Sequence, residues 1–295
     1  MLQCALGKLE SHPLPHPATT AAPPPPRQLR TSPITRYAGR ELNRIMTGNR
    51  IVAVCDILGF RSLVMNRPLQ ELLEGELAIF RKRVGFSVKH GEVAPLPPGL
   101  HDLRSQDRVG FAWFSDTLLI YAKDDADISC RKVIETVAWL LFSTMLTSTR
   151  VRAGIAYGEF AADSANEAYF GRAVVEAYEL EQAQEWAGAA LTQSASERLP
   201  RRDTTGARFQ WHVCEYPVPL KHSHPNCSGL AVDWTQGIHE SFDLQWSRQR
   251  NAPSDEERQS QPSICAKWDN TRRFHESVCV QCHPRNRERD PLKVM

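Results

Sequence analysis

Between residues 51 and 155, short apolar runs alternate with longer amphipathic stretches in an order that few folds can accommodate. β-Branched and aromatic residues dominate the short runs, which are therefore predicted to be buried strands. Apolar residues recur at helical spacing in the longer stretches, and Pro68 opens the first of them as a helix-starting residue. The predicted strands cover 51–56, 109–114, 117–122 and 151–155, and the predicted helices cover 68–84 and 127–147.

The order strand, helix, strand, strand, helix, strand is the ferredoxin-like pattern, an antiparallel sheet with helices on one face. We therefore predict an α+β fold with this βαββαβ core. A third helix over 173–186 and a short strand over 189–192 continue the domain. The later signals are weaker and predict a strand at 208–214, an extended edge at 216–220, a short helix at 242–250, a polar linker at 251–262 and a closing helix at 268–279.

The two ends of the chain differ from this central part in composition. Prolines crowd residues 1–48, and because proline removes amide donors and favours extended backbone, the segment is predicted to be disordered. It is either a flexible tail or an extension upstream of a translation start at Met46. The other boundaries are predicted as a catalytic domain over 49–200, an extension packed on it over 201–280 and a disordered tail over 281–295.

The charge balance argues against several kinds of partner. The chain carries 36 Lys and Arg against 34 Asp and Glu, and this net charge of +2 predicts neither a nucleic acid nor a membrane as partner. The longest apolar stretch, residues 137–145, is shorter than the roughly 20 residues of a membrane-spanning helix. No secretory signal is recognised, so we expect a cytoplasmic location and reduced thiols at the 8 cysteines.

Cys279, Cys282 and His283 form a Cys-x-x-Cys-His motif, which in other settings attaches haem or binds zinc. Haem attachment of this type requires export, for which no signal is recognised. A structural zinc site needs about four ligands, and the sequence offers no second close cysteine pair. We therefore expect no metal role for this segment.

Asp56 and Asp116 are the residues on which the chemical interpretation depends. Asp56 ends an apolar strand before a glycine turn, and Asp116 lies in the turn between two apolar strands. Because the first strand lies beside this hairpin in a ferredoxin-like sheet, the two carboxylates are expected to converge. Two carboxylates can hold a pair of hard cations, which suits phosphoryl transfer. Taken singly, Asp56 would cap a turn and Asp116 would be an ordinary hairpin residue, but their joint position favours the metal site.

Four short segments lie at 54–60 (VCDILGF), 114–120 (FSDTLLI), 151–158 (VRAGIAYG) and 169–174 (YFGRAV). In this order and at this spacing they resemble the class III nucleotide cyclases. The resemblance implies a homodimer with active sites at the interface. Asp56, Asp116 and the carbonyl of Ile57 would bind two divalent cations, Mn²⁺ or Mg²⁺. The backbone amides of Gly59 and Phe60 would hold the triphosphate.

Four positions depart from the usual adenylate and guanylate cyclase pattern. Ala112 and Ala168 stand where the resemblance places the side chains that read a purine base. Val175 and Glu179 stand where it places the Asn and Arg that stabilise the transition state. The chain is therefore either an inactive relic or a cyclase for another base, and the retention of both metal aspartates favours the second interpretation.

Further segments lie at 176–181, 186–188, 216–221, 232–234 and 270–275. Together with the first four they resemble the Pycsar family, the pyrimidine nucleotide cyclases of bacterial antiphage defence. This resemblance implies attack of the ribose 3′-oxygen on the α-phosphate of UTP or CTP, giving a 3′,5′-cyclic nucleotide and pyrophosphate. UTP is preferred over CTP only as the commoner substrate in that family. The cyclic product would act on a separate effector protein.

A positive group must stabilise the charge that grows on the phosphates during such a reaction. Arg152 and Arg172 are the candidates in the matching segments, and the alternative is that either is a solvent-exposed arginine. Tyr178 or Phe60 would stack on a pyrimidine ring or enclose it, and for Tyr178 the role of a core aromatic is favoured over this one.

Two other functions remain open beside a uridylate or cytidylate cyclase. An adenylate or guanylate cyclase keeps the chemistry and changes the base, and Ala112 and Ala168 argue against it. A non-catalytic dimeric sensor would bind nucleotide without turning it over. Incubation with each nucleoside triphosphate and Mn²⁺ separates these possibilities.

Overall fold

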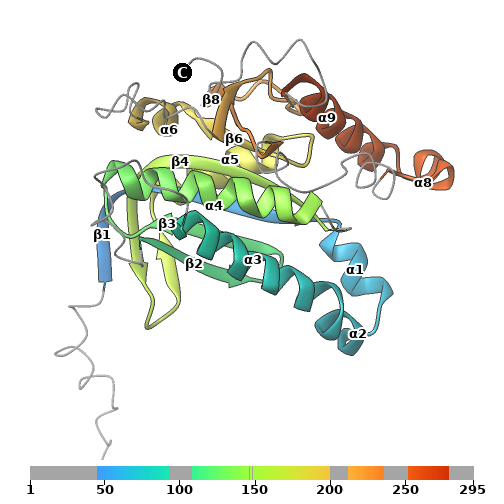
Figure 1. Cartoon of the computed structure of the whole chain (residues 1–295), viewed down its shortest axis with the longest axis horizontal. Helices are drawn as coiled ribbons and strands as arrows, with labels where there is room; N and C mark the ends of the chain where they lie inside the picture. Colours follow the sequence, from blue (N-terminus) through green and yellow to red (C-terminus); the bar gives the residue numbers. More distant parts are fainter. Residues whose placement is uncertain are drawn as a thin grey trace, which may run out of the picture. The chain divides into compact units, whose positions relative to one another are not determined.

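The computed structural model describes residues 45–93, 108–145, 147, 149–199, 212–235 and 252–278. Within this part of the chain, eight strands form one sheet in the order β2-β3-β1-β4-β6-β8-β7, with β5 paired to β4 (Figure 1). Neighbouring strands are antiparallel except for β4 and β6. The strands are β1 (Ile45–Leu58), β2 (Val109–Phe114), β3 (Thr117–Ala122), β4 (Arg150–Asp163), β5 (Ala168–Phe170), β6 (Ala189–Thr192), β7 (Val213–Glu215) and β8 (Cys227–Val232).

The strand order β2-β3-β1-β4 is that of the predicted ferredoxin-like core, so the fold class is α+β. β2, β3 and β6 begin and end where the sequence predicted. The other two predicted strands lie inside β1 and β4, which pair along their whole length. Ile45 lies opposite Asp163 at one end of this pair and Leu58 lies opposite Arg150 at the other.

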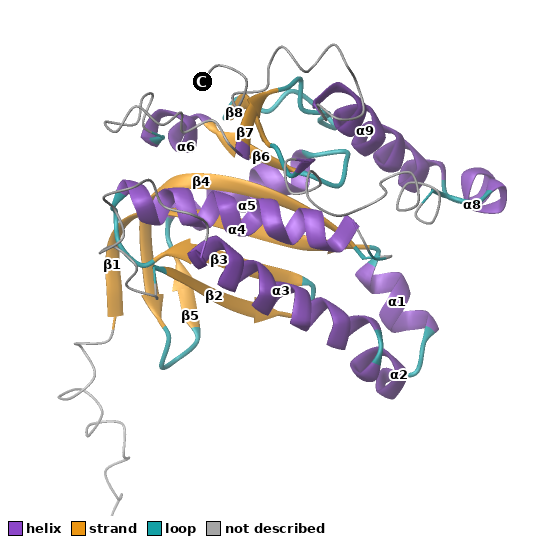
Figure 2. Cartoon of the chain, in the orientation of Figure 1, coloured by secondary structure: helices purple, strands orange, loops and turns teal. Residues whose placement is uncertain are grey.

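Helices cover both faces of the sheet (Figure 2). α3 and α4 pack together on one face, and α5 packs against β4 and β1 on the other. The alternation along β1 separates the faces, because Ala53 and Cys55 join the cluster beneath α4 whereas Val52 and Val54 join the cluster beneath α5. The helices are α1 (Phe60–Asn66), α2 (Leu69–Glu74), α3 (Glu76–Val93), α4 (Asp127–Met145), α5 (Arg172–Ala183), α6 (Gln193–Arg198), α8 (Asp255–Ser260) and α9 (Pro262–Val278).

Two boundaries near the start of the described chain differ from the predictions. β1 begins at Ile45, inside the range expected to be disordered, because β4 offers it an antiparallel partner that far. The single helix expected over 68–84 is divided, and α3 continues beyond its predicted end. Gly75 ends α2, where its N–H donates to the carbonyl oxygen of Glu71 at 2.8 Å.

The later elements were predicted less well. α8 lies in the stretch expected to be a polar linker, and β5, α6 and β8 were not predicted at all. Of the strand expected at 208–214, the structure describes only residues from 212 onward, which include β7. Residues 216–219 carry no regular structure, and Leu220 forms an isolated bridge with Gln184. The helix expected at 242–250 and the motif at 279–283 lie outside the described residues.

The C-terminal segment is built into the same sheet and core. β8 pairs with β6, and β7 extends the sheet beyond it. α9 is held by Phe274, which is fully buried against Trp186, Tyr216 and Trp234. Thr271 accepts a hydrogen bond at its Oγ1 from the N–H of Ala187, 2.8 Å away. The extension therefore touches the chain just after α5.

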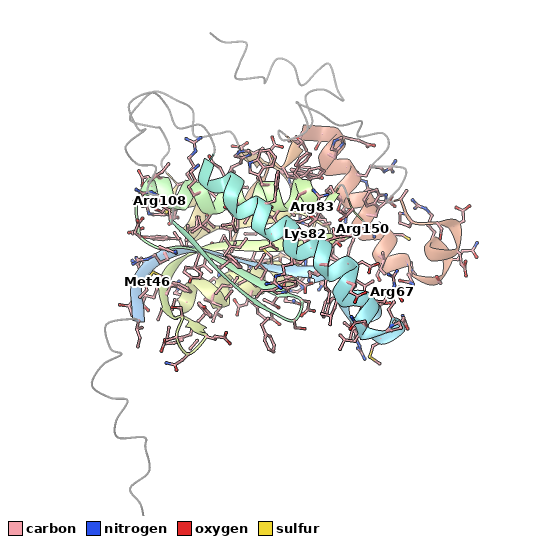
Figure 3. The ribbon with its side chains drawn as sticks, turned by 60° about the horizontal axis from the view of Figure 1, so that its bottom comes forward. Met46, Arg67, Lys82, Arg83, Arg108 and Arg150 are labelled. Atoms are coloured by element: carbon pink, nitrogen blue, oxygen red, sulfur yellow. The ribbon has the colours of Figure 1, made fainter. Side chains whose placement is uncertain are left out.

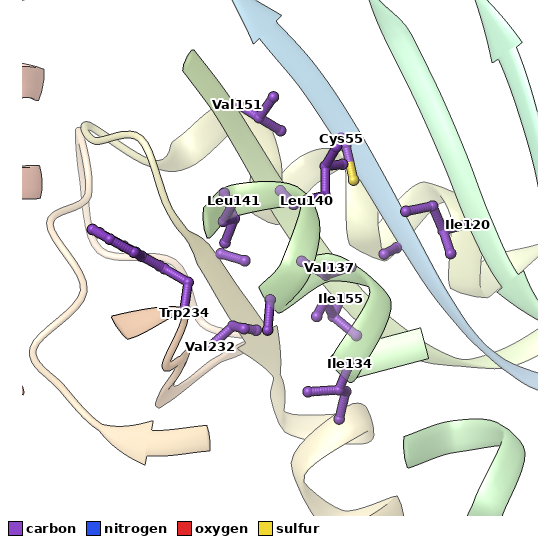
Figure 4. Close-up of a cluster of buried hydrophobic side chains, with 14 of the residues drawn as sticks. Cys55, Ile120, Ile134, Val137, Leu140, Leu141, Val151, Ile155, Val232 and Trp234 are labelled. Carbon is purple, nitrogen blue, oxygen red and sulfur yellow. The ribbon is translucent and has the colours of Figure 1, made fainter. Parts of the chain in front are cut away.

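α4 forms the centre of the main core (Figure 4). Its residues Val137, Leu140 and Leu141 are fully buried, with the sheet beneath and α3 alongside. Val232 and Trp234 belong to the same apolar cluster and come from the C-terminal segment. Burial on several sides explains why so little of this helix reaches solvent. No helix among the described residues is both long and apolar enough to cross a membrane.

A glycine sets the distance between α5 and the sheet, which gives a first prediction. A Cβ atom at Gly154 of β4 would lie 2.1 Å from the carbonyl oxygen of Ala177 and 2.7 Å from the amide nitrogen of Glu181. Both are backbone atoms, so α5 would have to move. Gly154→Ala should therefore lower the free energy of unfolding by about 1–3 kcal/mol in chemical denaturation.

Gly85 in α3 is the matched control, since a Cβ there meets nothing within 4 Å. Gly85→Ala should leave stability unchanged or raise it by up to about 1 kcal/mol, because alanine favours helix. Equal stability of both variants would show that α5 is not closely packed on β4.

Candidate active site

Asp56 lies near the end of β1, directly opposite Arg152 of β4. Its neighbours Cys55 and Ile57 point into the core beneath α4, so strand alternation turns the Asp56 side chain toward the α5 face. That side chain is 19% exposed. The site lies at the Arg150 end of the sheet, away from Met46 (Figure 3).

Asp116 occupies the β2–β3 turn at this same end of the sheet. Its backbone carbonyl accepts a hydrogen bond from the N–H of Ile57, 3.1 Å away, which ties the turn to the end of β1. The next residue, Thr117, lies opposite Asp56. Ser115 makes the tight turn possible by adopting a φ of 56°. The fold therefore brings the two predicted aspartates together at one place.

Arg152 joins Asp56 to the end of α5 through a buried network. Its guanidinium donates from Nε to Oε1 of Glu181 at 2.5 Å and from Nη1 to the carbonyl oxygen of Gln184 at 2.8 Å. Its Nη2 lies 3.5 Å from Oδ2 of Asp56. With 5% of its side chain exposed, Arg152 is not the solvent-exposed arginine that the sequence left open. Its guanidinium is engaged by protein groups on several sides.

Burial shapes the electrostatics of both carboxylates in this network. Burial raises the pKa of Asp56, and the charge of Asp116 adds to this, while Arg152 acts in the opposite direction. Burial also raises the pKa of Glu181, again opposed by Arg152 and supported by Asp56. The charge of Asp116 therefore acts on the Asp56 carboxyl, as expected of two carboxylates that lie near each other.

The residues present suit hard divalent cations. Two carboxylates at one sheet end provide the oxygen ligands that Mg²⁺ and Mn²⁺ prefer, and such ions commonly complete their shell with water and phosphate oxygens. The described residues contain no group of three or more His, Cys, Asp or Glu side chains able to hold a metal. A site here would thus depend on substrate oxygens as well as on Asp56 and Asp116.

The other residues predicted around the phosphates follow Asp56 directly. The side chain of Ile57 is buried in the core, so it can contribute a metal ligand only through its backbone carbonyl. Gly59 has a φ of 80°, which glycine adopts without strain, and it turns the chain from β1 into α1. Phe60 packs against the main core, which argues against a stacking role toward a base.

Arg172 and Tyr178 lie on α5 with exposed side chains. Arg172 begins α5 at the opposite end from Glu181, about 14 Å along the helix axis. Its Nε donates to Oε1 of Glu176 at 2.6 Å, and 74% of its side chain is exposed. Tyr178 is 51% exposed, so the interpretation as a core aromatic is wrong.

Four residues near the site were not singled out from the sequence. Glu181 and Gln184 bind Arg152, and the charges of Lys221 and Lys267 both lower the pKa of Asp56. Lys221 and Lys267 lie in the C-terminal segment, where the sequence signals were weak. Only the tertiary fold places these side chains beside Asp56.

The two positions that would read a purine base are small in this structure. Ala112 lies in β2 opposite Leu119 and packs at the edge of the apolar cluster on the α5 face. Ala168 lies in β5 opposite Asp163, at the far end of β4 from Arg152. Neither position offers a hydrogen-bonding side chain.

No protein-family model and no curated protein matches this chain. Solved structures do resemble it, among them the adenylyl cyclase CyaB from P. aeruginosa, with 13% identity over 64% of this chain and 95% of that chain and a TM-score of 0.42. The guanylyl cyclase Cya2 has 14% identity over 63% and 91% of the chains, with a TM-score of 0.39.

An adenylate/guanylate cyclase/hydrolase from Silicibacter pomeroyi has 13% identity over 64% of this chain and 96% of that chain, with a TM-score of 0.40. Because these TM-scores lie below 0.5, the likeness carries no argument about activity. The function must be inferred from the residues of this chain.

The raised pKa of Asp56 predicts that this residue destabilises the metal-free protein. The folded state holds the Asp56 proton more tightly than the unfolded state, so stability falls as pH rises above the ordinary carboxyl range. Asp56→Asn removes this penalty. In EDTA, the variant should therefore unfold at a higher temperature than the wild type at about pH 7, and the difference should shrink toward about pH 4.

Asp163 is the matched control, because a hydrogen bond from Asn166 lowers the pKa of that exposed carboxyl. Asp163→Asn should not stabilise the protein at neutral pH. A lower unfolding temperature for Asp56→Asn than for the wild type at about pH 7 would contradict the prediction.

Proposed function

We propose that this chain is a nucleotide cyclase that acts on a pyrimidine nucleoside triphosphate, with UTP preferred over CTP. The observation that supports the proposal is the backbone hydrogen bond from the N–H of Ile57 to the carbonyl oxygen of Asp116, because it joins the chain next to Asp56 to the turn that carries Asp116. The α+β core and the resemblance of the surrounding segments to class III cyclases support it. The preference for UTP rests on the resemblance alone.

In the proposed reaction, the ribose 3′-oxygen attacks the α-phosphorus of the same nucleotide. The O3′–P bond forms, the bond between the α-phosphorus and the bridging oxygen to the β-phosphate breaks, and pyrophosphate leaves. The 3′-hydroxyl proton passes to solvent. Two divalent cations, Mg²⁺ or Mn²⁺, would supply charge stabilisation for the attacking and leaving oxygens when bound.

The residues of this chain would position those groups. Asp56 and Asp116 supply carboxylate oxygens, with the carbonyl of Ile57 as a further ligand. The amides of Gly59 and Phe60 lie next in sequence and would face the phosphates. Arg152 keeps Asp56 in place from the side of α5, so we assign it to positioning rather than to direct contact with phosphate.

The pyrimidine assignment is supported by the absence of polar side chains at Ala112 and Ala168, the two positions expected to read a purine base. Ala112 and Ala168 offer no polar group to the larger purine bases, and a hydrogen-bonded base is read by polar side chains. The exposed Arg172 and Tyr178 would be free to contact a nucleotide across a homodimer interface. As a second messenger in the cytoplasm, the cyclic product would act through a separate effector in antiphage defence.

A non-catalytic nucleotide sensor is the second candidate. Val175 is exposed on α5, and Glu179 is acidic where the class III resemblance places a basic transition-state group. An acidic side chain there would oppose the developing negative charge rather than stabilise it. A chain with this departure would hold nucleotide without converting it.

The substrate prediction is tested with each of ATP, GTP, CTP and UTP in the presence of Mn²⁺, followed by nucleotide chromatography. We expect conversion of UTP to cyclic UMP and pyrophosphate, with CTP as the weaker substrate. Conversion of ATP alone would rule out the pyrimidine assignment. No conversion of any nucleotide, together with a flat metal titration, would favour the sensor.

The metal prediction is tested by substitution of the two aspartates. Asp56→Ala and Asp116→Ala should each lower kcat by about a thousandfold or more, because the charge stabilisation of the metal site is lost. Each variant should remain folded by circular dichroism. Asp255→Ala in the first turn of α8 is the control and should keep full activity. Near-normal activity of either site variant would refute the two-metal assignment.

A further inference from the structure

Cationic side chains from three segments gather at the C-terminal end of α5, beside Asp56. Arg152 of β4 reaches this end through the carbonyl oxygen of Gln184. Lys221 and Lys267, from the C-terminal segment, are close enough for their charges to act on Asp56. Of these cations, Arg152 lies 3.5 Å from the proposed metal ligand, and the other two act on it through their charges.

Lys221 is fixed there by the backbone. Its N–H donates to the carbonyl oxygen of Ala183 at 2.8 Å, and its Nζ donates to the carbonyl oxygen of Gln182 at 2.7 Å. The N–H of Glu185 donates to the carbonyl oxygen of Pro219 at 2.8 Å, so the two chain segments run side by side.

α9 brings Lys267 to the same place. Nδ2 of Asn270 donates to the carbonyl oxygen of Glu185 at 2.8 Å, which anchors the helix one turn beyond Lys267 on the same side. The guanidinium of Arg150 lies 4.9 Å from the ring centre of Trp268, the residue after Lys267. Arg150 and Arg152 are two residues apart on β4 and so project from the same face of the sheet.

The ammonium of Lys267 is the unusual member of this group. It is half-buried, and it makes no hydrogen bond or ion pair with any residue that the structure describes. Burial and then the charge of Arg152 lower its pKa, with Lys221 acting in the same direction and Glu185 and Asp56 opposing. A cation held among other cations is stabilised by any anion that enters.

Capping of the C-terminal end of α5 explains the positions of only some of these cations. Cations stabilise a helix C-terminus by binding its free carbonyl groups, and Arg152 and Lys221 do this for α5. Lys267 does not, since its side chain reaches none of those carbonyls. A ligand from outside the described protein accounts better for its position.

We propose that Lys267, supported by Lys221, binds the anionic phosphates of the nucleotide beside Asp56, so that α9 completes the substrate site. The identity of the ligand as a nucleotide triphosphate rests on the proposed function, whereas the anion site rests on the cluster itself. A divalent cation held by Asp56 would offset its negative charge, and the surroundings of Lys267 would then favour a polyanion further.

The test measures binding of inorganic triphosphate to the full chain by calorimetry, with Mg²⁺ present and with Mg²⁺ absent. Lys267→Met should weaken binding by about tenfold or more, as for the loss of one charge-assisted hydrogen bond. Lys267→Arg, which keeps the charge, should restore most of the affinity. Lys267→Gln provides a second neutral variant should the methionine variant not fold by circular dichroism.

Arg272 is the matched control on the same helix. It pairs with Asp269 and Glu276, and 49% of its side chain is exposed. Arg272→Gln removes the same charge from α9 and should leave triphosphate binding unchanged. Equal binding by the Lys267 and Arg272 variants, or no binding by the wild type, would overturn the site.

The two proposals fail in different ways. Loss of triphosphate binding on Lys267→Met, in a protein that converts no nucleotide, would leave the anion site standing and remove the cyclase. Nucleotide cyclisation with unchanged KM and kcat in Lys267→Met would leave the cyclase standing and remove the anion site. In the case we expect, KM for UTP rises by about tenfold in Lys267→Met and stays constant in Arg272→Gln.

Discussion

The geometry of the site depends on the contacts that the buried guanidinium of Arg152 makes with Asp56, Glu181 and Gln184. A charge removed from water must be paired and hydrogen-bonded. Arg152 finds three partners: Asp56 on β1, Glu181 on α5 and the carbonyl of Gln184 just beyond that helix. These contacts require α5 to lie close to the sheet. Gly154 permits that approach, because any side chain there would meet the helix backbone. The packing at Gly154 and the ion pairs of Arg152 thus both set the distance between α5 and the sheet.

The segment that follows α5 links this network to the C-terminal part of the chain. From the last turn of α5 onward, the carbonyls of Gln182, Gln184 and Glu185 accept hydrogen bonds from Lys221, Arg152 and Asn270, and the N–H of Ala187 donates to Thr271. The aromatic cluster around Phe274 then fixes α9 from the other side. A movement of α9 would therefore shift the backbone that binds Arg152 and so change the position of Asp56. The proposed site thus includes the C-terminal extension.

The sequence was informative where local pattern and tertiary role agree. The β2–β3 hairpin was predicted to the residue, because apolar runs flank an obvious turn, and this hairpin also brings Asp116 to Asp56. Pattern failed where the partner is distant: Glu181 lies 29 residues after Arg152, and nothing local marks it as a counter-ion. α8 was missed because a polar helix lacks apolar periodicity. Tyr178 was wrongly predicted to be buried, because the face of α5 that carries it is exposed to solvent.

The charges around Asp56 suit the binding of both a cation and an anion. Three acidic groups, Asp56, Asp116 and Glu181, interact there with three cations, Arg152, Lys221 and Lys267. The free protein is thus close to neutral at the site. Divalent cations at the aspartates would make it strongly positive, and only a polyanion such as a triphosphate would restore the balance. Metal and phosphate would then bind with positive cooperativity, since each removes the unfavourable charge that the other creates.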